Sequence, residues 1–156
     1  MSFEAVQPIF APIATQWFYT GPSGSGVAMK LVVNTLLGLG MQSIAEAVAL
    51  GSVLRLHREL LLDVPAKTAV VAAAHAGKLA TAKRNDCAPQ FPIRLMSKDF
   101  GLILTAAAQC GLSMPTTGAV VVNSVEAETG GEEDFSAVIR RMEQQVGLEH
   151  ALPPVA

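Results

Sequence analysis

The sequence predicts an all-α fold, a bundle of helices arranged around one long central helix. Residues 26–56 contain no proline and are apolar nearly all the way round, so at about 1.5 Å per residue they form a helix of about 45 Å. A helix of that composition is typical of the buried centre of a bundle. Apolar residues make up 51% of the 156 residues and charged residues only 15%, against about 25% in an ordinary soluble domain. Part of the apolar surface is therefore expected to lie in an interface.

Further helices are expected downstream, and proline and glycine mark their ends. Proline fits the first turn of a helix, and glycine fits the residue just past its end. The Asp134 or Ser136 side chain can cap the last helix by accepting a hydrogen bond from a free backbone N–H. The expected elements are a helix over 64–83 that begins at Val64-Pro65, a loop over 85–92, a helix over 93–110, a helix over 115–129 that ends at Gly130-Gly131, and a last helix through about Gln145.

The chain divides into three parts in this interpretation. Residues 1–20 end in the aromatic cluster Trp17, Phe18 and Tyr19, which predicts an irregular or strand-like segment leading into a turn at residues 21–24. Residues 21–147 form the helical domain. Residues 148–156 are rich in proline and are expected to be a flexible tail.

Charge and cysteine content exclude several classes of function. The net charge is −2 and the basic residues are scattered, so no basic stripe favours nucleic acid as a partner. Cys87 and Cys110 lack the spacing of a redox pair, and the N-terminus lacks the form of a signal peptide, which favours the cytoplasm. His57, His75 and His150 do not have the spacing of zinc ligands. No metal site is expected.

The long helix is apolar enough to raise the question of a membrane span. Lys30, Asn34, Gln42 and Glu46 fall inside its apolar window, and charges at such depths are costly in hydrocarbon. The sequence therefore favours a buried helix, and no membrane is expected as a partner.

Two polar residues on the long helix are candidates for chemistry. Lys30 and Asn34 are four residues apart and share one face among Val, Leu and Met neighbours. An ammonium that is partly removed from water gives up its proton more readily, which suits proton transfer, and a nearby amide can orient a substrate oxygen. The plainer alternative is that both residues bridge neighbouring helices.

Two other motifs also have a plain interpretation. Gly24-Ser25-Gly26 is similar to part of a dinucleotide-binding turn, but Met29 occupies the third glycine position. A glycine turn that lets the long helix pack closely is favoured. Lys98-Asp99 is, by itself, a solvated lysine beside an acid that suits the N-terminal half of its helix.

Several motifs in the same order as in a known family carry a resemblance over most of the chain. Residues 21–34, GPSGSGVAMKLVVN, resemble the G-x-x-G-x-G-x-x-x-K-x-x-x-N signature of the β-hydroxyacid dehydrogenases, which include 3-hydroxyisobutyrate dehydrogenase and tartronate semialdehyde reductase. Residues 91–100 resemble the family's phenylalanine-to-Lys-Asp stretch. Residues 111–115 resemble its glycine-to-proline junction, and residues 130–138 resemble its closing G-x-x-D-x-S-A-V segment.

The resemblance implies an NAD(P)-dependent oxidoreductase site that acts on a small hydroxyacid or semialdehyde. Lys30 is the implied catalytic acid and base, Asn34 and Gly24 are implied to bind substrate, and Lys98 and Phe91 are implied to lie at the NAD or NADP coenzyme. In the family this helical domain follows an N-terminal Rossmann domain, of which residues 1–20 resemble only the last part.

The chain is therefore expected to be a C-terminal domain that is inactive alone. It is expected to form a homo-oligomer and to use a separate Rossmann-domain chain for catalysis. The alternative is a non-catalytic module, derived from such a domain, for oligomerisation or for binding a small ligand.

Overall fold

The computed structural model describes residues 3–122 and 131–147, and in these ranges it is helical with no strand. The predicted all-α class is confirmed. In chain order the elements are α1 (Phe3–Phe10), α2 (Ser25–Val53), α3 (Arg58–Ala66), α4 (Ala73–Lys83), α5 (Ile93–Gln109), α6 (Pro115–Val122), the short 3-10 helix η1 (Phe135–Ala137) and α8 (Val138–Gln145).

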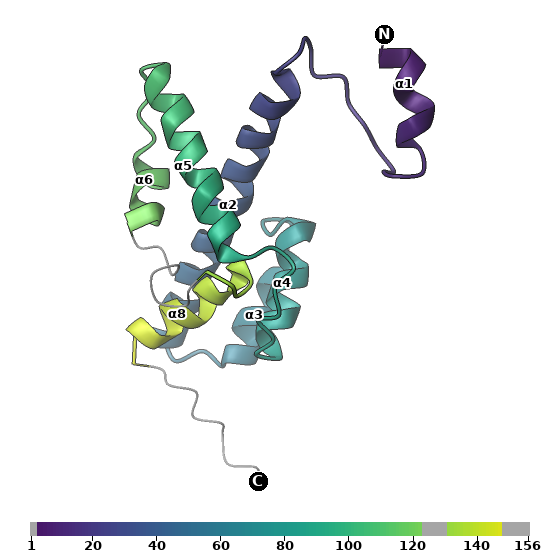
Figure 1. Ribbon diagram of the computed structural model, residues 1–156. Helices are drawn as coiled ribbons and strands as arrows, with labels where there is room; N and C mark the ends of the chain where they lie inside the picture. Colours follow the sequence, from purple (N-terminus) through teal and green to yellow (C-terminus); the bar gives the residue numbers. More distant parts are fainter. Residues whose placement is uncertain (1–2, 123–130, 148–156) are drawn as a thin grey trace.

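Helix α2 is the predicted central helix, and the other helices pack around it. Figure 1 shows α5 and α6 beside its upper part and α3, α4 and α8 around its lower part. The helix begins where expected, after a turn that ends at Gly24. The φ angle of Gly24 is +97°, a left-handed conformation that glycine adopts without strain. The turn therefore requires glycine at this position.

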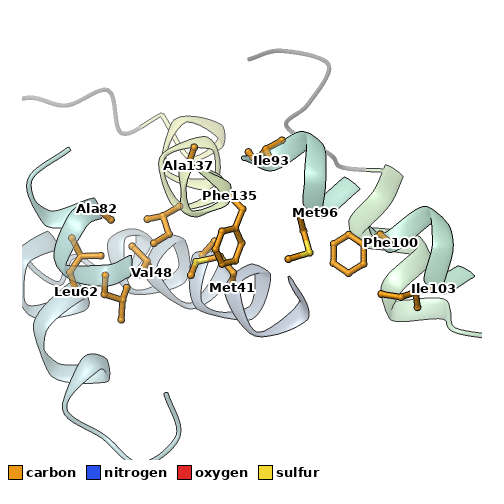
Figure 2. Packing of buried hydrophobic residues seen from close by; sticks show 13 residues of the cluster. Met41, Val48, Leu62, Ala82, Ile93, Met96, Phe100, Ile103, Phe135 and Ala137 are labelled. Carbon is orange, nitrogen blue, oxygen red and sulfur yellow. The ribbon is translucent and has the colours of Figure 1, made fainter. Parts of the chain in front are cut away.

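The core lies between the buried side of α2 and the helices that cover it. Met41, Ala45 and Val48 of α2 are almost fully buried, and Figure 2 shows Met41 and Val48 facing the covering elements. At Gly38 a β-carbon would stand 2.3 Å from the Phe100 ring. A larger residue there would push α5 away from α2.

Two buried ion pairs join segments that are far apart in the chain. Arg58 of α3 donates to the Glu143 carboxylate of α8 at 2.6 Å and to the backbone carbonyl of Ala82 at 3.1 Å. Lys78 of α4 donates to Asp134 at 2.7 Å. Glu143 and Asp134 are each 2% exposed, so both carboxylates depend on these donors in place of water.

The segment predicted around Trp17 to Tyr19 as irregular or strand-like is irregular in the structure. Residues 14–20 have no regular structure, and helix α1 precedes them. A single strand without a neighbour leaves its backbone groups unpaired. The aromatic rings pack against α1 instead, Tyr19 on Phe3 and Trp17 on Phe10, with ring centroids 5.2 and 6.5 Å apart.

The helix predicted to begin at Val64-Pro65 is wrong. Pro65 lies in the last turn of α3, whose end is closed by Lys67 and Thr68 donating to the carbonyls of Val64 and Pro65. The next helix starts only at Ala73. Proline is compatible with either end of a helix, and the sequence alone did not show which end this was.

The other boundaries agree with prediction wherever they are described. Helix α5 ends before Cys110, Gly111 has a left-handed φ of +69°, and α6 begins at Pro115. Asp134 caps η1, which leads directly into α8, by accepting from the Ser136 N–H at 3.1 Å. The expected end of the 115–129 helix at Gly130 and the tail 148–156 lie outside the described residues.

Helix α2 is also long and apolar enough to cross a membrane, by length and composition alone. The central helix of a soluble bundle meets the same criteria, and α2 has five covering helices of the described chain against it.

We expect Glu143→Ala to lower the free energy of unfolding by about 3 kcal/mol, because it leaves Arg58 partly buried without its partner. The matched control is Glu132→Ala, which breaks an exposed pair with Arg94 and should cost less than about 1 kcal/mol. Urea unfolding followed by circular dichroism measures both. Equal losses would show that the buried pair contributes no more than the exposed one.

Candidate functional site

A buried carboxylate between α2 and α5 brings three of the predicted site residues together. The Lys30 ammonium lies 3.2 Å from both carboxylate oxygens of Asp99, and the Asn34 amide donates to Oδ2 of Asp99 at 2.6 Å. Lys98 lies 3.3 Å from Oδ1 of the same carboxylate. Asp99 is 1% exposed, whereas the Lys30 and Lys98 side chains are 53% and 57% exposed. The cluster thus has a buried acid beneath two accessible ammonium groups.

The local sequence explains why these groups meet. Lys30 and Asn34 lie one helical turn apart on α2, so their side chains reach the same point on α5. On α5 the residues Met96, Phe100 and Ile103 face the core. Asp99 precedes Phe100 on the same buried side, which directs its carboxylate to α2.

The donors decide the charge state of Asp99. Burial raises the pKa of this carboxyl, but the hydrogen bonds from Lys30, Lys98 and Asn34 outweigh burial and hold the pKa below its ordinary value of 3.8. Asp99 is therefore ionised at neutral pH. Its negative charge holds both lysine ammonium groups at one place beside the Asn34 amide.

Gly24 and Phe91 lie outside this cluster. Gly24 is the N-cap residue of α2, six residues before Lys30, which is about 9 Å along the helix axis. Phe91 precedes α5, and its ring packs edge-on against Phe135 with centroids 5.7 Å apart. The substrate role of Gly24 and the coenzyme role of Phe91 therefore stay predictions.

Asp134 holds the segment that carries Phe91. Its Oδ2 accepts from the backbone N–H groups of Gln90 and Phe91 at 3.1 and 3.0 Å and from the Lys78 ammonium, and its Oδ1 accepts from the Ser136 hydroxyl at 2.7 Å. Burial raises the pKa of Asp134, and the Lys78 and Ser136 hydrogen bonds lower it by more. The carboxylate of Asp134 thus fixes the path of the chain into α5.

Asp99 is the site residue that sequence reasoning missed. It was interpreted as an acid that suits the N-terminal half of its helix, although its spacing from Met96, Phe100 and Ile103 placed it on the buried side of α5. A charged residue on an apolar face needs a hydrogen-bond partner. Lys30 and Asn34 are also polar residues among apolar neighbours, so they were the candidate donors for Asp99. The bridging role that was left open for these two residues is what the structure shows.

Lys30 is only partly removed from water, since its side chain is 53% exposed. The ammonium is nevertheless held by Asp99. The arrangement can present a proton donor and an amide to a small polar molecule at the surface.

The described residues offer no cluster that is placed to bind a metal ion. No group of three or more His, Cys, Asp or Glu side chains in these ranges is placed to hold a metal ion. Cys87 and Cys110 are both free thiols, and burial raises the pKa of Cys87. The Lys30 cluster is the candidate site.

The all-α fold with a long central helix agrees with the fold that the resemblance of residues 21–34 implies. Residues 24–142 match the family described as NAD-binding of NADP-dependent 3-hydroxyisobutyrate dehydrogenase. The chain belongs to this family, whose description implies a nicotinamide coenzyme.

Curated relatives agree with this family. The chain is 34% identical over 149 residues to 2-(hydroxymethyl)glutarate dehydrogenase from Eubacterium barkeri. This match covers 94% of this chain and 50% of that protein. It is 32% identical over 139 residues to glyoxylate/succinic semialdehyde reductase 1 from Arabidopsis thaliana, covering 88% and 48%. The chain thus spans about half the length of the curated relatives it matches.

Solved structures show the same fold. A 3-hydroxyisobutyrate dehydrogenase from Salmonella typhimurium matches with a TM-score of 0.81 at 22% identity, covering 89% of this chain and 50% of that one. The Mycobacterium tuberculosis 3-hydroxyisobutyrate dehydrogenase, in a structure with L-serine, matches with a TM-score of 0.77 at 29% identity over the same shares.

We expect Asp99→Asn to lower the free energy of unfolding by about 1–3 kcal/mol at pH 7, because it removes the charge from three hydrogen bonds. The pKa of Asp99 is lower in the folded chain than in the unfolded chain, so this stabilisation is present above pH 3.8 and is lost as the pH falls through the lowered value. The wild type and the variant should converge in stability toward pH 2.

Urea unfolding at pH 7, 5, 4, 3 and 2.5 measures this convergence. Asp63→Asn is the control, because Asp63 pairs with Lys83 at the surface, where solvent screens the pair, so its loss should change the stability much less than Asp99→Asn does. A difference between the wild type and Asp99→Asn that stays constant down to pH 2.5 would contradict the assignment.

Proposed function

We propose that this chain is the C-terminal, helical half of an NAD(P)-dependent 3-hydroxyacid dehydrogenase and contributes Lys30 as its proton-transferring group. The observation that carries the proposal is the convergence of Lys30, Asn34 and Lys98 on the buried Asp99 carboxylate. The three residues that the family signature implies in a dehydrogenase site meet at one place, although α5 begins far along the chain from α2.

The chemistry requires a proton partner beside a carbonyl. When hydride reaches the carbonyl carbon, negative charge develops on its oxygen, and the Lys30 ammonium donates the proton that makes the hydroxyl. In the reverse direction the neutral amine takes that proton while hydride leaves the carbon. The nicotinamide coenzyme supplies or accepts the hydride when it is bound.

The surrounding residues hold Lys30 in place. Asp99 keeps the ammonium within 3.2 Å of a fixed carboxylate while more than half of the side chain remains accessible. Asn34 lies one turn further along α2 and can orient a substrate oxygen through its amide. Lys98 brings a second positive charge, which favours a substrate carboxylate or a coenzyme phosphate.

The residues present fit only part of a coenzyme site. The described ranges contain a glycine turn at residues 21–24, at the start of α2, but no strand from which a Rossmann-type cradle for the pyrophosphate is built. We therefore propose that a Rossmann domain, on the same or a separate polypeptide, provides that cradle. The choice between NAD and NADP then belongs to that domain.

The substrate class follows from the charge at the site. A small semialdehyde or oxoacid carries both the carbonyl that Lys30 needs and a carboxylate that two ammonium groups attract. The named substrates of the relatives, glyoxylate and succinic semialdehyde among them, have this form.

The second candidate is a non-catalytic module for oligomerisation or for binding a small ligand. Exposed apolar side chains along α2, such as Leu36 and Leu50, favour the assembly role. In that case the Lys30 cluster would be structural only.

We expect this chain, mixed with the nucleotide-binding half of a relative such as the Eubacterium barkeri dehydrogenase, to oxidise NADH or NADPH with glyoxylate or succinic semialdehyde. Absorbance at the reduced nicotinamide band measures the rate. Lys30→Ala should lower kcat by at least about 100-fold, the usual effect of losing a general acid.

Lys67→Ala is the matched control, because Lys67 is an exposed lysine beyond the end of α3 and outside the cluster. It should leave kcat and KM unchanged. A complex that forms but shows no rate with either coenzyme or either aldehyde would favour the non-catalytic module.

A further inference from the structure

Lys30 is both the proposed proton donor and an accessible primary amine. Its side chain is 53% exposed, so a small molecule can reach the nitrogen from solvent. The semialdehydes proposed above as substrates carry an aldehyde carbonyl. Neutral primary amines combine with such carbonyls, and enzymes that use lysine as a nucleophile form Schiff bases in this way. The candidate site therefore brings together two groups that can react covalently.

The reaction in question is imine formation. The lone pair of a neutral amine attacks the aldehyde carbon, the C–N bond forms, and the carbonyl oxygen takes up two protons and leaves as water. In a dehydrogenase site this product has a further fate, because hydride from the reduced coenzyme would add to the same carbon. The protonated imine would become a secondary amine, the coenzyme would be oxidised, and the alkyl group would permanently occupy the place of the substrate.

Protonation of Lys30 decides which reaction occurs, because an ammonium has no lone pair with which to attack. The Lys30 nitrogen lies 3.2 Å from both carboxylate oxygens of Asp99, which is 1% exposed. Loss of the Lys30 proton would take a charged donor away from this buried carboxylate. An opposite charge at such a distance favours the charged form of a titratable group by about 10-fold or more.

We propose that Asp99 is a positioning residue that keeps Lys30 in the ammonium form, so that Lys30 gives a proton to an aldehyde substrate and does not bind to it covalently. Asp99 thus selects between two reactions of one amine. In the oxidative direction Lys30 takes up the proton as the carbonyl forms, so it is again an ammonium when the aldehyde appears. The inference rests on the proposed function, because it takes the substrate to be an aldehyde.

The other donors to Asp99 fit this role. Asn34 donates to Oδ2 at 2.6 Å, and its amide nitrogen is not a nucleophile toward aldehydes. Lys98 lies 3.3 Å from Oδ1, whereas Lys30 lies at equal distances from both oxygens. The carboxylate is therefore satisfied by one group that cannot form an imine and by two ammonium groups that it holds in the unreactive form.

Reductive trapping tests the proposal on the chain alone. The chain is incubated with succinic semialdehyde and sodium cyanoborohydride, which reduces imines in preference to aldehydes. Peptide mass spectrometry then follows the carboxypropyl adduct at each of the five lysines. Lys67 is the internal reference, because it is an exposed lysine beyond the end of α3. In the wild type we expect Lys30 to react at least about 10-fold more slowly than Lys67.

Two variants separate the charge of Asp99 from its shape. Asp99→Asn keeps the size of the side chain but removes the charge, and it should raise the rate of adduct formation at Lys30 at least about 10-fold. Asp99→Glu keeps the charge and changes the size, and it should leave Lys30 protected. The rate at Lys67 should be the same in all three proteins, and circular dichroism confirms that each is folded. A purely structural role for Asp99 would not give protection with glutamate and loss of protection with asparagine.

Two results would overturn the proposal. The first is a wild-type chain in which Lys30 reacts as fast as Lys67, and this comparison needs no variant. The second is a folded Asp99→Asn variant in which Lys30 reacts as slowly as in the wild type, which would show that limited access protects the amine. Neither coenzyme nor a partner chain takes part in the trapping. The absence of NADH or NADPH oxidation in the mixing experiment would therefore count against the proposed function alone.

Discussion

A carboxylate in a helical core has to find hydrogen-bond donors from the chain, and Asp99 finds them on two helices. Lys30 and Asn34 come from α2, and Lys98 comes from α5. Leaving any of these partners out would bury a charge without compensation. The same need fixes the way α2 and α5 cross, and with it the position of the candidate site. The crossing of α2 and α5 and the position of the candidate site thus both depend on the Asp99 carboxylate.

Buried carboxylates join the rest of the domain in the same way. Asp134 ties the segment before α5 to η1 and α4, and Glu143 ties α8 to α3. Each links parts of the chain that are more than forty residues apart, where apolar packing alone would allow sliding. Helix α2 then has three distinct sides: a buried one toward the core, a polar one at Asp99, and an apolar one that the described chain leaves open.

The helices were predictable where a local rule applies. Periodic apolar residues located α2 and α5, Gly111 and Pro115 located the junction before α6, and Asp134 was identified as a cap. Prediction failed at Pro65, and it left two forms open around Trp17 to Tyr19. There the local sequence is compatible with two outcomes, and contacts with other segments decide between them.

The sequence by itself determined the helical class, the family signature and the pairing of Lys30 with Asn34 on one face, because all three depend on spacing within a single segment. Only the tertiary structure decided that Asp99 lies between them and Lys98, that Phe91 packs on Phe135, and that Lys30 remains accessible. These features depend on contacts between segments more than forty residues apart and on how α2 and α5 cross. No spacing within one segment determines a crossing, since it is set by the side chains of both helices together.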